Sequence, residues 1–354
     1  MKLNELKKYD SSINLVYPDF WDSKISGIST TESPMANHIV FIREKKFLEN
    51  FLEKLRSGNI NSSNIVLIEE KFWNCLQEDN GTLLKDMKRV LSMIATVKDV
   101  NLSMSRLSRP YYEKMVDDFD DIVDGRKTET ARIHPETKIA PNVFIGKNVV
   151  IERGAIINSG CVILSNSKIG EDTILYPNVS IYQNVKIGKN CRLHSGVVIG
   201  SDGFGYNFDG TKHVKVWHMG GAILENNVEI GSCSCIDGGT FSPTIIGNGS
   251  KIDNGVQIGH NCFIGKGVIL CGHVGLSGSC TVGHYTVMGG KSGMGPGVTI
   301  GDSCQVAGGA LVSKDWPSKS VVAGHPARSI NDWFRANAFI QNQIKKKKKT
   351  IKGS

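Results

Sequence analysis

An aliphatic residue returns at every sixth position over more than half of the chain. The repeat runs without a miss through residues 133–199, resumes at 224–236, slips by four residues and continues through 246–312. Neither a helix, with a period of 3.6, nor a strand, with a period of 2, produces this spacing. Hexapeptide repeats are typical of parallel β-helices, whose coils bury their core against neighbouring coils. The three runs hold 12, 3 and 12 hexads, which predicts nine three-sided coils and a prism about 40 Å long.

Turn-forming residues follow the aliphatic positions, and one long segment interrupts them. Strings such as IGKN, IGED and IDNG place Gly, Asn or Asp where the chain must turn a corner. The interruption, SDGFGYNFDGTKHVKVWHMGGAI, carries Phe204, Tyr206, Lys215, Trp217 and His218. A loop projecting from a regular prism contacts a ligand or a neighbouring subunit, or simply packs on the prism, and the sequence leaves these alternatives open.

The rest of the chain divides into shorter parts. Residues 1–108 mix strand-like runs (HIVFI, NIVLI) with helical runs (FLENFLEKLRSG), which predicts an α/β domain. We assign residues 109–130 to a charged linker and 131–317 to the β-helix, and we expect a loop, one helix and a frayed lysine-rich tail in 318–354. The predicted fold class is mainly β, a parallel β-helix with an N-terminal α/β domain and a C-terminal helix.

Composition excludes several classes of protein. With 40% hydrophobic and 21% charged residues, the chain can bury a core and is not disordered throughout. Six of its 42 basic residues lie in 345–352, which leaves 36 against 34 acidic residues, so the fold offers no basic surface for nucleic acid. No run approaches about 18 apolar residues and the start lacks a secretory leader, so we expect a cytoplasmic protein with no integral membrane segment.

Asp253 and His260 are the first candidates for chemistry. They lie seven residues apart, which we interpret as adjacent faces near a shared corner. A hydrogen bond between them would fix the imidazole tautomer and leave the other nitrogen as a general base. The alternative is a corner aspartate and a half-exposed histidine that never meet. Gly278 follows His260 by one coil of 18 residues, so its N–H could steady an oxyanion.

Other constellations give weaker signals. A metal site of His260, His284 and Cys262 is conceivable, but hexapeptide carbonic anhydrases have a second histidine five residues on, where this chain has Gly265. Nine cysteines without a CxxC pair also argue against a zinc cluster or a disulfide framework, and we predict no metal. Phe41 and Phe47 flank Glu44, and aromatic residues at this spacing are more often core than ligand platform.

Several strings together resemble the UDP-3-O-acylglucosamine N-acyltransferase family of lipid A biosynthesis. The matching strings are ISGISTTESPMANHIVFI, IGSDGFGY, VKVWHMG, VEIGSCSCID and IGNGSKIDNGVQIGHN. The resemblance implies a left-handed β-helix that forms a homotrimer. It implies transfer of a 3-hydroxyacyl chain from the phosphopantetheine arm of acyl carrier protein to the 2-amine of UDP-3-O-acylglucosamine, with no other cofactor.

The resemblance also implies roles for individual residues. His260 matches the general base, Asp253 its partner and Gly278 the oxyanion donor. The implied substrate-binding residues are Phe41, Glu44, Phe47, Asn261, His218 and His284. Phe41 and Phe47 match aromatic residues that flank the uracil ring, and Glu44 stands where the family usually has Asn. Gly297 replaces a second family histidine, so either His284 or His218 compensates, the substrate contact is weaker, or the chain is a divergent paralogue.

Acyl carrier protein is acidic in general, which raises the question of a basic partner surface. Lys314, Arg328, Arg335 and the lysine tail are candidates, and residues 324–328 (GHPAR) resemble the loop that contacts the pantetheine arm. For the tail itself we favour a solubilising role with at best weak attraction to anionic lipid. Two other functions remain in competition: a nucleotide-sugar N-acetyltransferase using acetyl-CoA, and a β-helix binding protein that has lost activity.

Overall fold

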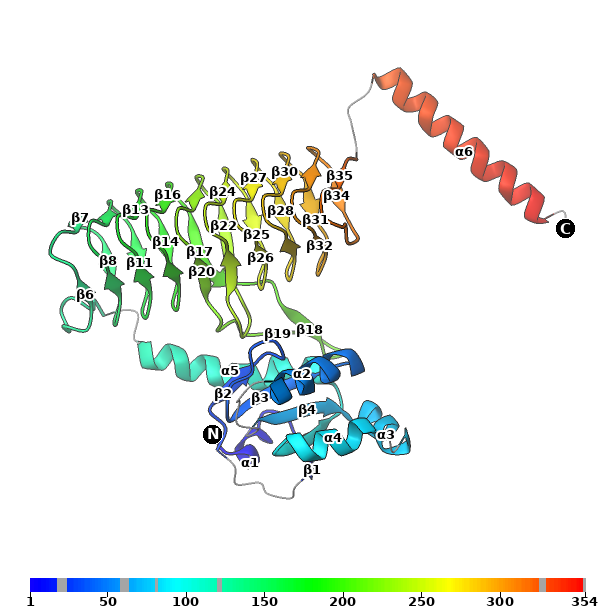
Figure 1. Ribbon diagram of the computed structural model, residues 1–354, viewed down its shortest axis with the longest axis horizontal. Helices are drawn as coiled ribbons and strands as arrows, with labels where there is room; N and C mark the ends of the chain where they lie inside the picture. Colours follow the sequence, from blue (N-terminus) through cyan, green and yellow to red (C-terminus); the bar gives the residue numbers. More distant parts are fainter. Residues whose placement is uncertain (18–23, 58–63, 80–81, 120–122, 325–328, 353–354) are drawn as a thin grey trace.

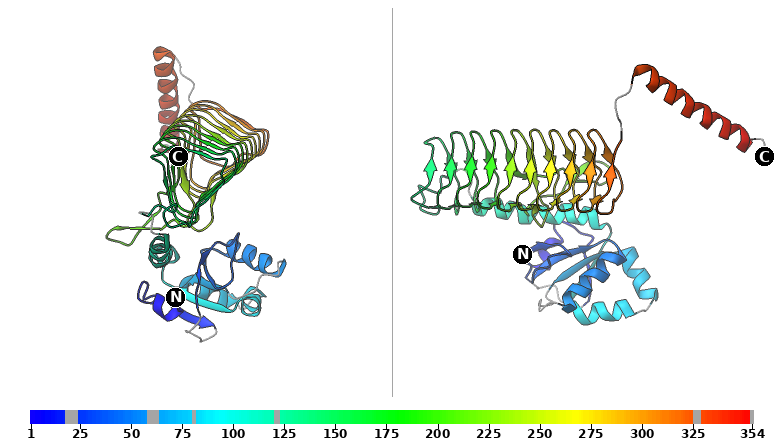
Figure 2. Two further views of the ribbon diagram at one scale, coloured as in Figure 1. Left: turned by 90° about the vertical axis from the view of Figure 1, so that its left-hand side faces the viewer. Right: turned by 45° about the horizontal axis from the view of Figure 1, so that its top comes forward.

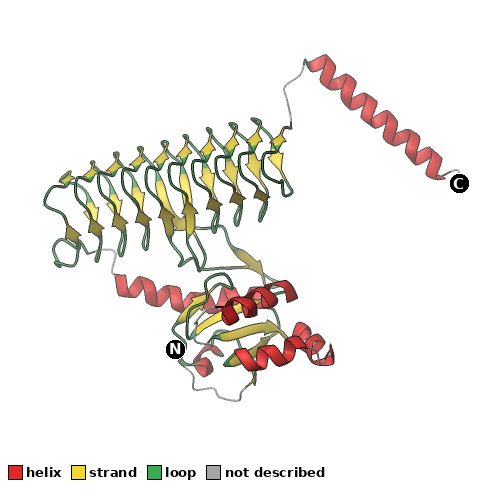
Figure 3. Ribbon diagram, in the orientation of Figure 1, coloured by secondary structure: helices red, strands yellow, loops and turns green. Residues whose placement is uncertain are grey.

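A triangular prism dominates the molecule. The computed structural model describes residues 1–17, 24–57, 64–79, 82–119, 123–324 and 329–352. Parallel strands stack along the prism in three sheets, and a separate α/β domain lies beside one edge (Figure 1). Viewed along its length, the prism has a three-sided outline (Figure 2). Among the described residues, the helices lie in the α/β domain and at the C-terminus (Figure 3). The predicted fold class, a left-handed parallel β-helix with these two additions, is confirmed.

Each face of the prism is one sheet, which we name by its first strand. The β6 sheet contains β6 (Arg132–Ile133), β9 (Val150–Ile151), β12 (Lys168–Ile169), β15 (Lys186–Ile187), β20 (Ala222–Leu224), β23 (Thr244–Ile246), β26 (Phe263–Ile264), β29 (Thr281–Val282) and β32 (Thr299–Ile300). The β7 sheet contains β7 (Lys138–Ile139), β10 (Ile156–Ile157), β13 (Ile174–Leu175), β16 (Arg192–Leu193), β21 (Glu229–Ile230), β24 (Lys251–Ile252), β27 (Ile269–Leu270), β30 (Val287–Met288), β33 (Gln305–Val306) and β35 (Val321–Val322). The β8 sheet contains β8 (Phe144–Ile145), β11 (Val162–Ile163), β14 (Ser180–Ile181), β17 (Val198–Asp202), β22 (Cys235–Gly238), β25 (Gln257–Ile258), β28 (Gly275–Leu276), β31 (Gly293–Met294) and β34 (Leu311–Val312).

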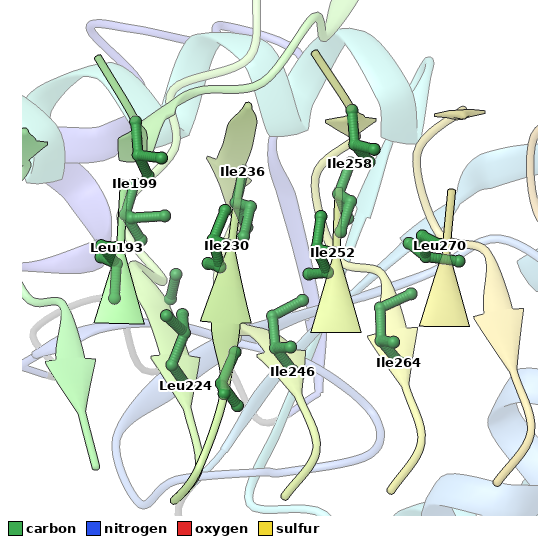
Figure 4. Close-up of a cluster of buried hydrophobic side chains, with 14 of the residues drawn as sticks. Leu193, Ile199, Leu224, Ile230, Ile236, Ile246, Ile252, Ile258, Ile264 and Leu270 are labelled. Atoms are coloured by element: carbon green, nitrogen blue, oxygen red, sulfur yellow. The ribbon is translucent and has the colours of Figure 1, made fainter. Parts of the chain in front are cut away.

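The periodic aliphatic residues form the core of the prism. Ile258, Ile264 and Leu270 come from the three faces of one coil and are fully buried. Figure 4 shows such side chains in rows along the interior. Because each coil buries about three large aliphatic side chains, each worth roughly 1.5–3 kcal/mol when buried, the stack is stabilised along its whole length.

The corners are built from residues in the left-handed backbone region. Asn148 and Asn166 have φ of 57° and 59°, and Gly154 has φ of 71°. Asn tolerates this conformation better than other side chains and Gly has no Cβ to clash. The turn signals after each aliphatic anchor therefore mark the corners, as predicted.

Both breaks in the hexapeptide rhythm lie at one corner. Most coils take 18 residues, but Ile187 pairs with Leu224 and Leu224 pairs with Ile246. The extra residues of the first long coil form the predicted loop, which contains the antiparallel strands β18 (Tyr206–Phe208) and β19 (His213–Lys215). Both insertions follow a strand of the β8 sheet and precede a strand of the β6 sheet. We call this edge of the prism the β8–β6 corner.

The N-terminal domain is a five-stranded sheet covered by helices. The strand order is β1 (Asn14–Tyr17), β5 (Met93–Val97), β4 (Ile65–Glu69), β3 (His38–Ile42) and β2 (Gly27–Ser29), and only β1 is antiparallel. The helices are α1 (Leu3–Leu6), α2 (Lys45–Ser57), α3 (Glu70–Asp79), α4 (Thr82–Val90) and α5 (Val100–Phe119). The predicted boundary at residue 108 falls inside α5, because this long helix spans from the domain toward the prism.

Helix α5 and the projecting loop connect the two parts of the molecule. Asn207 Nδ2 donates to the carbonyl of Asn101 at 2.9 Å, and the Trp217 N–H donates to Ser108 Oγ at 3.2 Å. The rings of Tyr112 and Trp217 lie 4.6 Å apart. The loop is therefore packed against the N-terminal domain rather than free in solvent.

The C-terminal helix α6 (Ile330–Lys352) extends away from the prism (Figure 1). It continues through the lysine run, where the sequence predicts a frayed tail, in keeping with the good helix propensity of lysine. In the described part of the chain, no helix is long and apolar enough to span a bilayer.

Candidate active site

The structure places Asp253, His260 and His284 at three different corners. Asp253 follows β24 of the β7 sheet, His260 follows β25 of the β8 sheet, and His284 follows β29 of the β6 sheet. Six residues move the chain by one face, so positions seven apart lie at consecutive corners. The expected contact between Asp253 and His260 is therefore wrong. Residues share a corner only when their spacing is a whole coil.

Asp253 belongs to a different surface. Its Oδ1 accepts hydrogen bonds from the N–H and the Nδ2 of Asn254 at 2.7 and 2.9 Å. It lines a cavity of about 460 Å³ together with His194, Lys251 and others, and His260 is absent from that lining. Within one chain, Asp253 cannot orient the imidazole.

His260 takes its orientation from Asn261 instead. Its Nδ1 lies 3.0 Å from Asn261 Oδ1, and that oxygen also accepts from the N–H of Thr240 at 3.0 Å. Asn261 Nδ2 donates to the carbonyl of Ser242 at 3.0 Å, which fixes the amide orientation. Since Oδ1 can only accept, Nδ1 must carry the proton. Nε2 of neutral His260 is therefore a free proton acceptor.

Asn261 was predicted to bind substrate, and its contacts describe another role. Both of its polar side-chain atoms are engaged within the protein, with Thr240 and Ser242 as well as His260. Because the amide cannot exchange protons, it holds the tautomer without competing for the proton that Nε2 takes. The sequence string IGHN contained this neighbour, but its spacing gave no indication of the contact.

Gly278 lies directly against the free nitrogen of His260. A Cβ added to Gly278 would fall 2.5 Å from His260 Nε2, so only glycine lets the imidazole sit there. At a comparable position of another corner, the backbone N–H donates to a side chain of the next coil. The backbone N–H of Lys266, for example, donates to His284 Nδ1 at 2.9 Å. The residue one coil beyond Gly278 is Pro296, which offers no side-chain acceptor. Among the described residues the Gly278 N–H has no acceptor.

These groups open into one large cavity at the β8–β6 corner. The cavity measures about 880 Å³, and its lining includes Phe204, Asp237, Gln257, His260 and Gly278. Gly297, which stands where the resemblance implies a second histidine, also lines it and has φ of 69°. His260 is only partly buried, so its ring faces this space.

Asp237 and Gln257 were missed by the sequence analysis. Gln257 Nε2 donates to Asp237 Oδ1 at 3.1 Å. Burial raises the pKa of Asp237, and the hydrogen bond from Gln257 and the charge of His260 oppose that rise. A signal was available, because both interruptions of the hexapeptide repeat and His260 itself all follow strands of the β8 sheet. Counting the faces along the repeat would have placed both insertions and His260 at the same corner of the prism.

His218 is the second histidine of this corner. Its ring lies edge-on to that of His260, with centroids 5.1 Å apart, and is only 6% exposed. Gly203 permits this contact, since a Cβ there would come within 2.5 Å of His260 Cβ and 2.8 Å of His218 Nε2. Burial, followed by the charge of His260, lowers the pKa of His218 from 6.5 to about 4. Neither ring nitrogen of His218 has a partner among the described residues.

Within one chain, His284 lies apart from the β8–β6 corner. Its Nδ1 accepts from the Lys266 N–H, and its own N–H donates to Asp302 Oδ1 at 2.7 Å. Within one chain His284 lies at another corner than His260, and its role as a substrate-binding residue stays a prediction. The metal alternative needs His260, His284 and Cys262 in one place, and within one chain the two histidines lie at different corners. In the described ranges, no three His, Cys, Asp or Glu side chains gather as metal ligands.

The projecting loop contributes one aromatic side chain, Phe204, to the lining of the cavity. Phe204 is 87% exposed and packs edge-on against Tyr206 with centroids 5.1 Å apart. Lys215 pairs with Asp202 and lies 4.9 Å from the ring centroid of Trp217. Phe204 and Tyr206 thus form a small exposed aromatic surface at the rim of the cavity.

Phe41 and Phe47 of the N-terminal domain are partly buried. The ring of Phe41, on β3, stacks on Phe241 of the prism with centroids 6.2 Å apart. The guanidinium of Arg43 lies 6.0 Å from the ring centroid of Phe47, and Glu44 is exposed. One face of Phe41 is thus already covered by the prism, close to where the two insertions emerge.

The candidate basic residues for a partner are only partly described. Lys314 lies 5.1 Å from the ring centroid of Trp316, and Arg335 pairs with Asp332 at 3.3 Å. Arg328 and most of the GHPAR segment lie outside the described residues, and the side chains of the lysine tail are likewise not described.

Comparison with known proteins supports the resemblance. Residues 126–203 match the family described as GMPPB C-terminal domain, and residues 280–314 match the hexapeptide repeat of succinyl-transferase. The chain is 43% identical over 159 residues to UDP-3-O-acylglucosamine N-acyltransferase from Helicobacter hepaticus, covering 45% of this chain and 49% of the relative. It is 46% identical over 160 residues to the enzyme of that name from Helicobacter pylori strain 26695, covering 45% and 48%.

Solved structures with a related description are more distant. UDP-N-acetylglucosamine O-acyltransferase from Moraxella catarrhalis is 28% identical with a TM-score of 0.45, covering 55% of this chain and 72% of that one. The corresponding acyltransferase from Francisella novicida is 30% identical with a TM-score of 0.41, covering 55% and 65%. The chain matches about half the length of the curated relatives, to which it is similar over less than half of its own length.

Proposed function

We propose that the protein is an N-acyltransferase that acts in the cytoplasm on UDP-3-O-acylglucosamine. It transfers a 3-hydroxyacyl chain from acyl carrier protein to the 2-amine of the sugar. The observation that carries this proposal is the pairing of a free His260 Nε2 with an unpaired Gly278 N–H at the edge of one cavity. The relatives, which bear the name of this activity, support the same reaction.

The geometry accounts for the chemistry of acyl transfer. The neutral amine attacks the thioester carbon, and its proton passes to Nε2 of His260. The Gly278 N–H donates to the carbonyl oxygen as it gains negative charge. Collapse of the intermediate breaks the C–S bond, and the proton on His260 passes to the departing sulfur. A neutral amine is already a good nucleophile, so a positioned base and an oxyanion donor are sufficient.

A smooth trough beside His260 supports a long acyl chain over an acetyl group. The outward positions of β25, β28, β31 and β34 are Gln257, Gly275, Gly293 and Leu311. A Cβ at Gly275 would meet nothing within 4 Å, and Leu311, 74% exposed, leans over Gly293. Gly275 lines the same cavity as His260 and leaves open backbone on which methylene groups can lie, and Leu311, which covers the buried Gly293, bounds this trough. An acetyl donor would leave this trough unused.

The N-terminal domain supplies the proposed uridine site. Phe41 and Phe47 offer flat apolar surfaces on which a base can stack. The Glu44 carboxylate can accept a hydrogen bond from the uracil N3–H but cannot donate to its carbonyls. Arg43, placed beside Phe47, is a cation close to the same surface. We propose that the nucleotide binds here while the sugar reaches the β8–β6 corner.

Two partners belong to the proposal. The acyl donor is acyl carrier protein, approached by basic residues such as Lys314 and Arg335, with no cofactor beyond its pantetheine arm. The second partner is a further copy of the chain in a homotrimer, as the family resemblance implies. For the lysine run we retain a solubilising role, with weak peripheral attraction to anionic lipid.

Mass spectrometry of the product tests the proposed function. The protein is incubated with UDP-3-O-acylglucosamine and a mixture of 3-hydroxyacyl carrier protein and acetyl-CoA. We expect a single product that carries a 3-hydroxyacyl group on nitrogen. An N-acetyl product would favour the acetyltransferase alternative. Binding of the UDP-sugar without any product would favour a β-helix that has lost activity, for which Gly297 in place of a histidine is the strongest argument.

A further inference from the structure

Asp237 is a carboxylate in the active-site cavity without a cationic partner. Its Oδ1 accepts from Gln257 Nε2 at 3.1 Å, and the Ser201 hydroxyl is a second neutral donor. The neighbouring Asp202, by contrast, is paired with Lys215. In the part of the chain that the structure describes, no lysine or arginine forms an ion pair with Asp237. A half-buried carboxylate held only by neutral donors is poised for a positive charge from outside the protein.

The proposed substrate brings such a charge. An amine on a sugar carbon has a pKa near that of an α-amino group, about 7.7–8, so it arrives mainly as an ammonium at neutral pH. Acylation removes two protons from that nitrogen, one before the attack and one during it. Nε2 of His260 can take only one of them in each turnover.

We propose that Asp237 binds the ammonium group of the aminosugar and takes its first proton. This inference rests on the proposed function and deepens it. The ammonium N–H bond breaks and the proton joins the carboxylate, which gives a neutral amine and a neutral carboxylic acid. The amine then forms the C–N bond as its second proton moves to His260 Nε2 and on to the thiolate. The proton on Asp237 returns to water when the product leaves.

Burial favours this proton transfer through its effect on both the donor and the acceptor. Removing water from the cavity disfavours the ammonium and the carboxylate alike, so the neutral pair gains relative to the ion pair. The raised pKa of Asp237 is consistent with that tendency. The charged or titratable groups that face Asp237 are Asp202 on β17, Cys235 on its own strand and His260 beyond β25. Of these, Asp202 raises the pKa of Asp237 and His260 lowers it.

Asp237→Asn is the variant that tests the proposal. Asn keeps an oxygen to accept from Gln257 and removes the proton acceptor. At pH 6.5 only about 5% of an amine of pKa near 7.8 is neutral, so kcat/KM should fall roughly 20-fold relative to the wild type. At pH 9 the amine is already neutral and the two proteins should agree within about twofold. The matched control is Asp172→Asn at a distant corner, where φ is 54° and Asn suits the backbone; its ratio to the wild type should stay constant with pH.

A substrate analogue with a hydroxyl in place of the 2-amine sharpens the test. A hydroxyl loses only one proton, so Asp237→Asn should not impair its acylation, whereas His260→Ala should impair both substrates. A defect in Asp237→Asn that is constant with pH, or equal for amine and hydroxyl, would overturn the proposal. Thermal unfolding of each variant checks that the fold is retained.

Binding without an acyl donor separates this inference from the proposed function. Calorimetry at pH 6.5 should show that the wild type prefers the amine over the hydroxyl analogue by about tenfold or more, and that Asp237→Asn loses this preference. If the wild type forms no N-acyl product yet shows the preference, the proposed function fails and the ammonium site stands. If both proteins bind amine and hydroxyl equally, the ammonium site is refuted whatever the activity.

Discussion

Replacing Gly278 by Ala perturbs His260 without touching the histidine itself. The added Cβ would lie 2.5, 2.7 and 2.9 Å from Nε2, Cε1 and Cδ2 of the ring. Ordinary carbon contacts begin near 3.5 Å, so the imidazole must withdraw by about 1 Å. The backbone of Gly278 lies outside the left-handed region, so alanine introduces no strain of its own.

The expected cost follows from the required precision of the base. A displacement of about 1 Å in a catalytic group can cost on the order of 100-fold in rate, which equals about 2.7 kcal/mol of transition-state stabilisation. We therefore expect kcat/KM for N-acylation to fall roughly 100-fold, with a change in Tm of only a few degrees. Initial rates with 3-hydroxyacyl carrier protein as donor measure the effect.

Two comparisons make this prediction specific. Gly295→Ala is the matched control, because it lies at the same corner one coil away and its Cβ would make only contacts of 3.7 Å or more. In a His260→Ala background, Gly278→Ala should cause little further loss, because both changes remove the same interaction. Activity of Gly278→Ala within threefold of the wild type, with the fold intact, would refute the assignment of His260 Nε2.

Three further predictions concern the surroundings of the site. The pKa of His218 falls from 6.5 to about 4 on folding, so its contribution to stability is present above pH 6.5 and is lost as the pH falls toward 4. Denaturant unfolding should show that His218→Gln removes up to about 3 kcal/mol of this acid sensitivity; equal sensitivity in both proteins would contradict the buried neutral ring. Gly275→Leu should lower kcat/KM about tenfold for long acyl donors and little for short ones, and an equal loss for both would argue against the trough. Phe41→Ala should raise KM for the UDP-sugar about tenfold at unchanged kcat, as expected for lost base stacking; an unchanged KM would place the uridine elsewhere.

The prism could be predicted from the repeat, but the residues that meet at its corners could not. A hexapeptide period has one structural solution, so the three sheets and their buried aliphatic residues follow from spacing alone. The predicted pairing of Asp253 with His260 is wrong because residues on adjacent faces, each just past the end of its strand, lie at different corners. In a coil with three faces, seven residues carry the chain from one corner to the next.

Side-chain chemistry at the corner depends on the insertions, whose paths carry no periodic signal. His218 lies beside His260 on a loop whose neighbouring residue, Trp217, contacts α5. Asn261 orients the imidazole because the second insertion brings the backbone of Thr240 and Ser242 to its amide. Spacing could mark Gly278 as the neighbour of His260, since no insertion lies between them. Spacing could not predict the contacts that residues of the two insertions make with His260 and Asn261.

The rate of N-acylation by His260→Ala tests the central claim most directly. Nε2 of this histidine is proposed to remove the proton from the sugar nitrogen, so the variant should lose at least about 100-fold in the donor-dependent rate while still binding the UDP-sugar. A rate equal to that of the wild type, measured on folded protein with the same donor, would show that the proton leaves by another route.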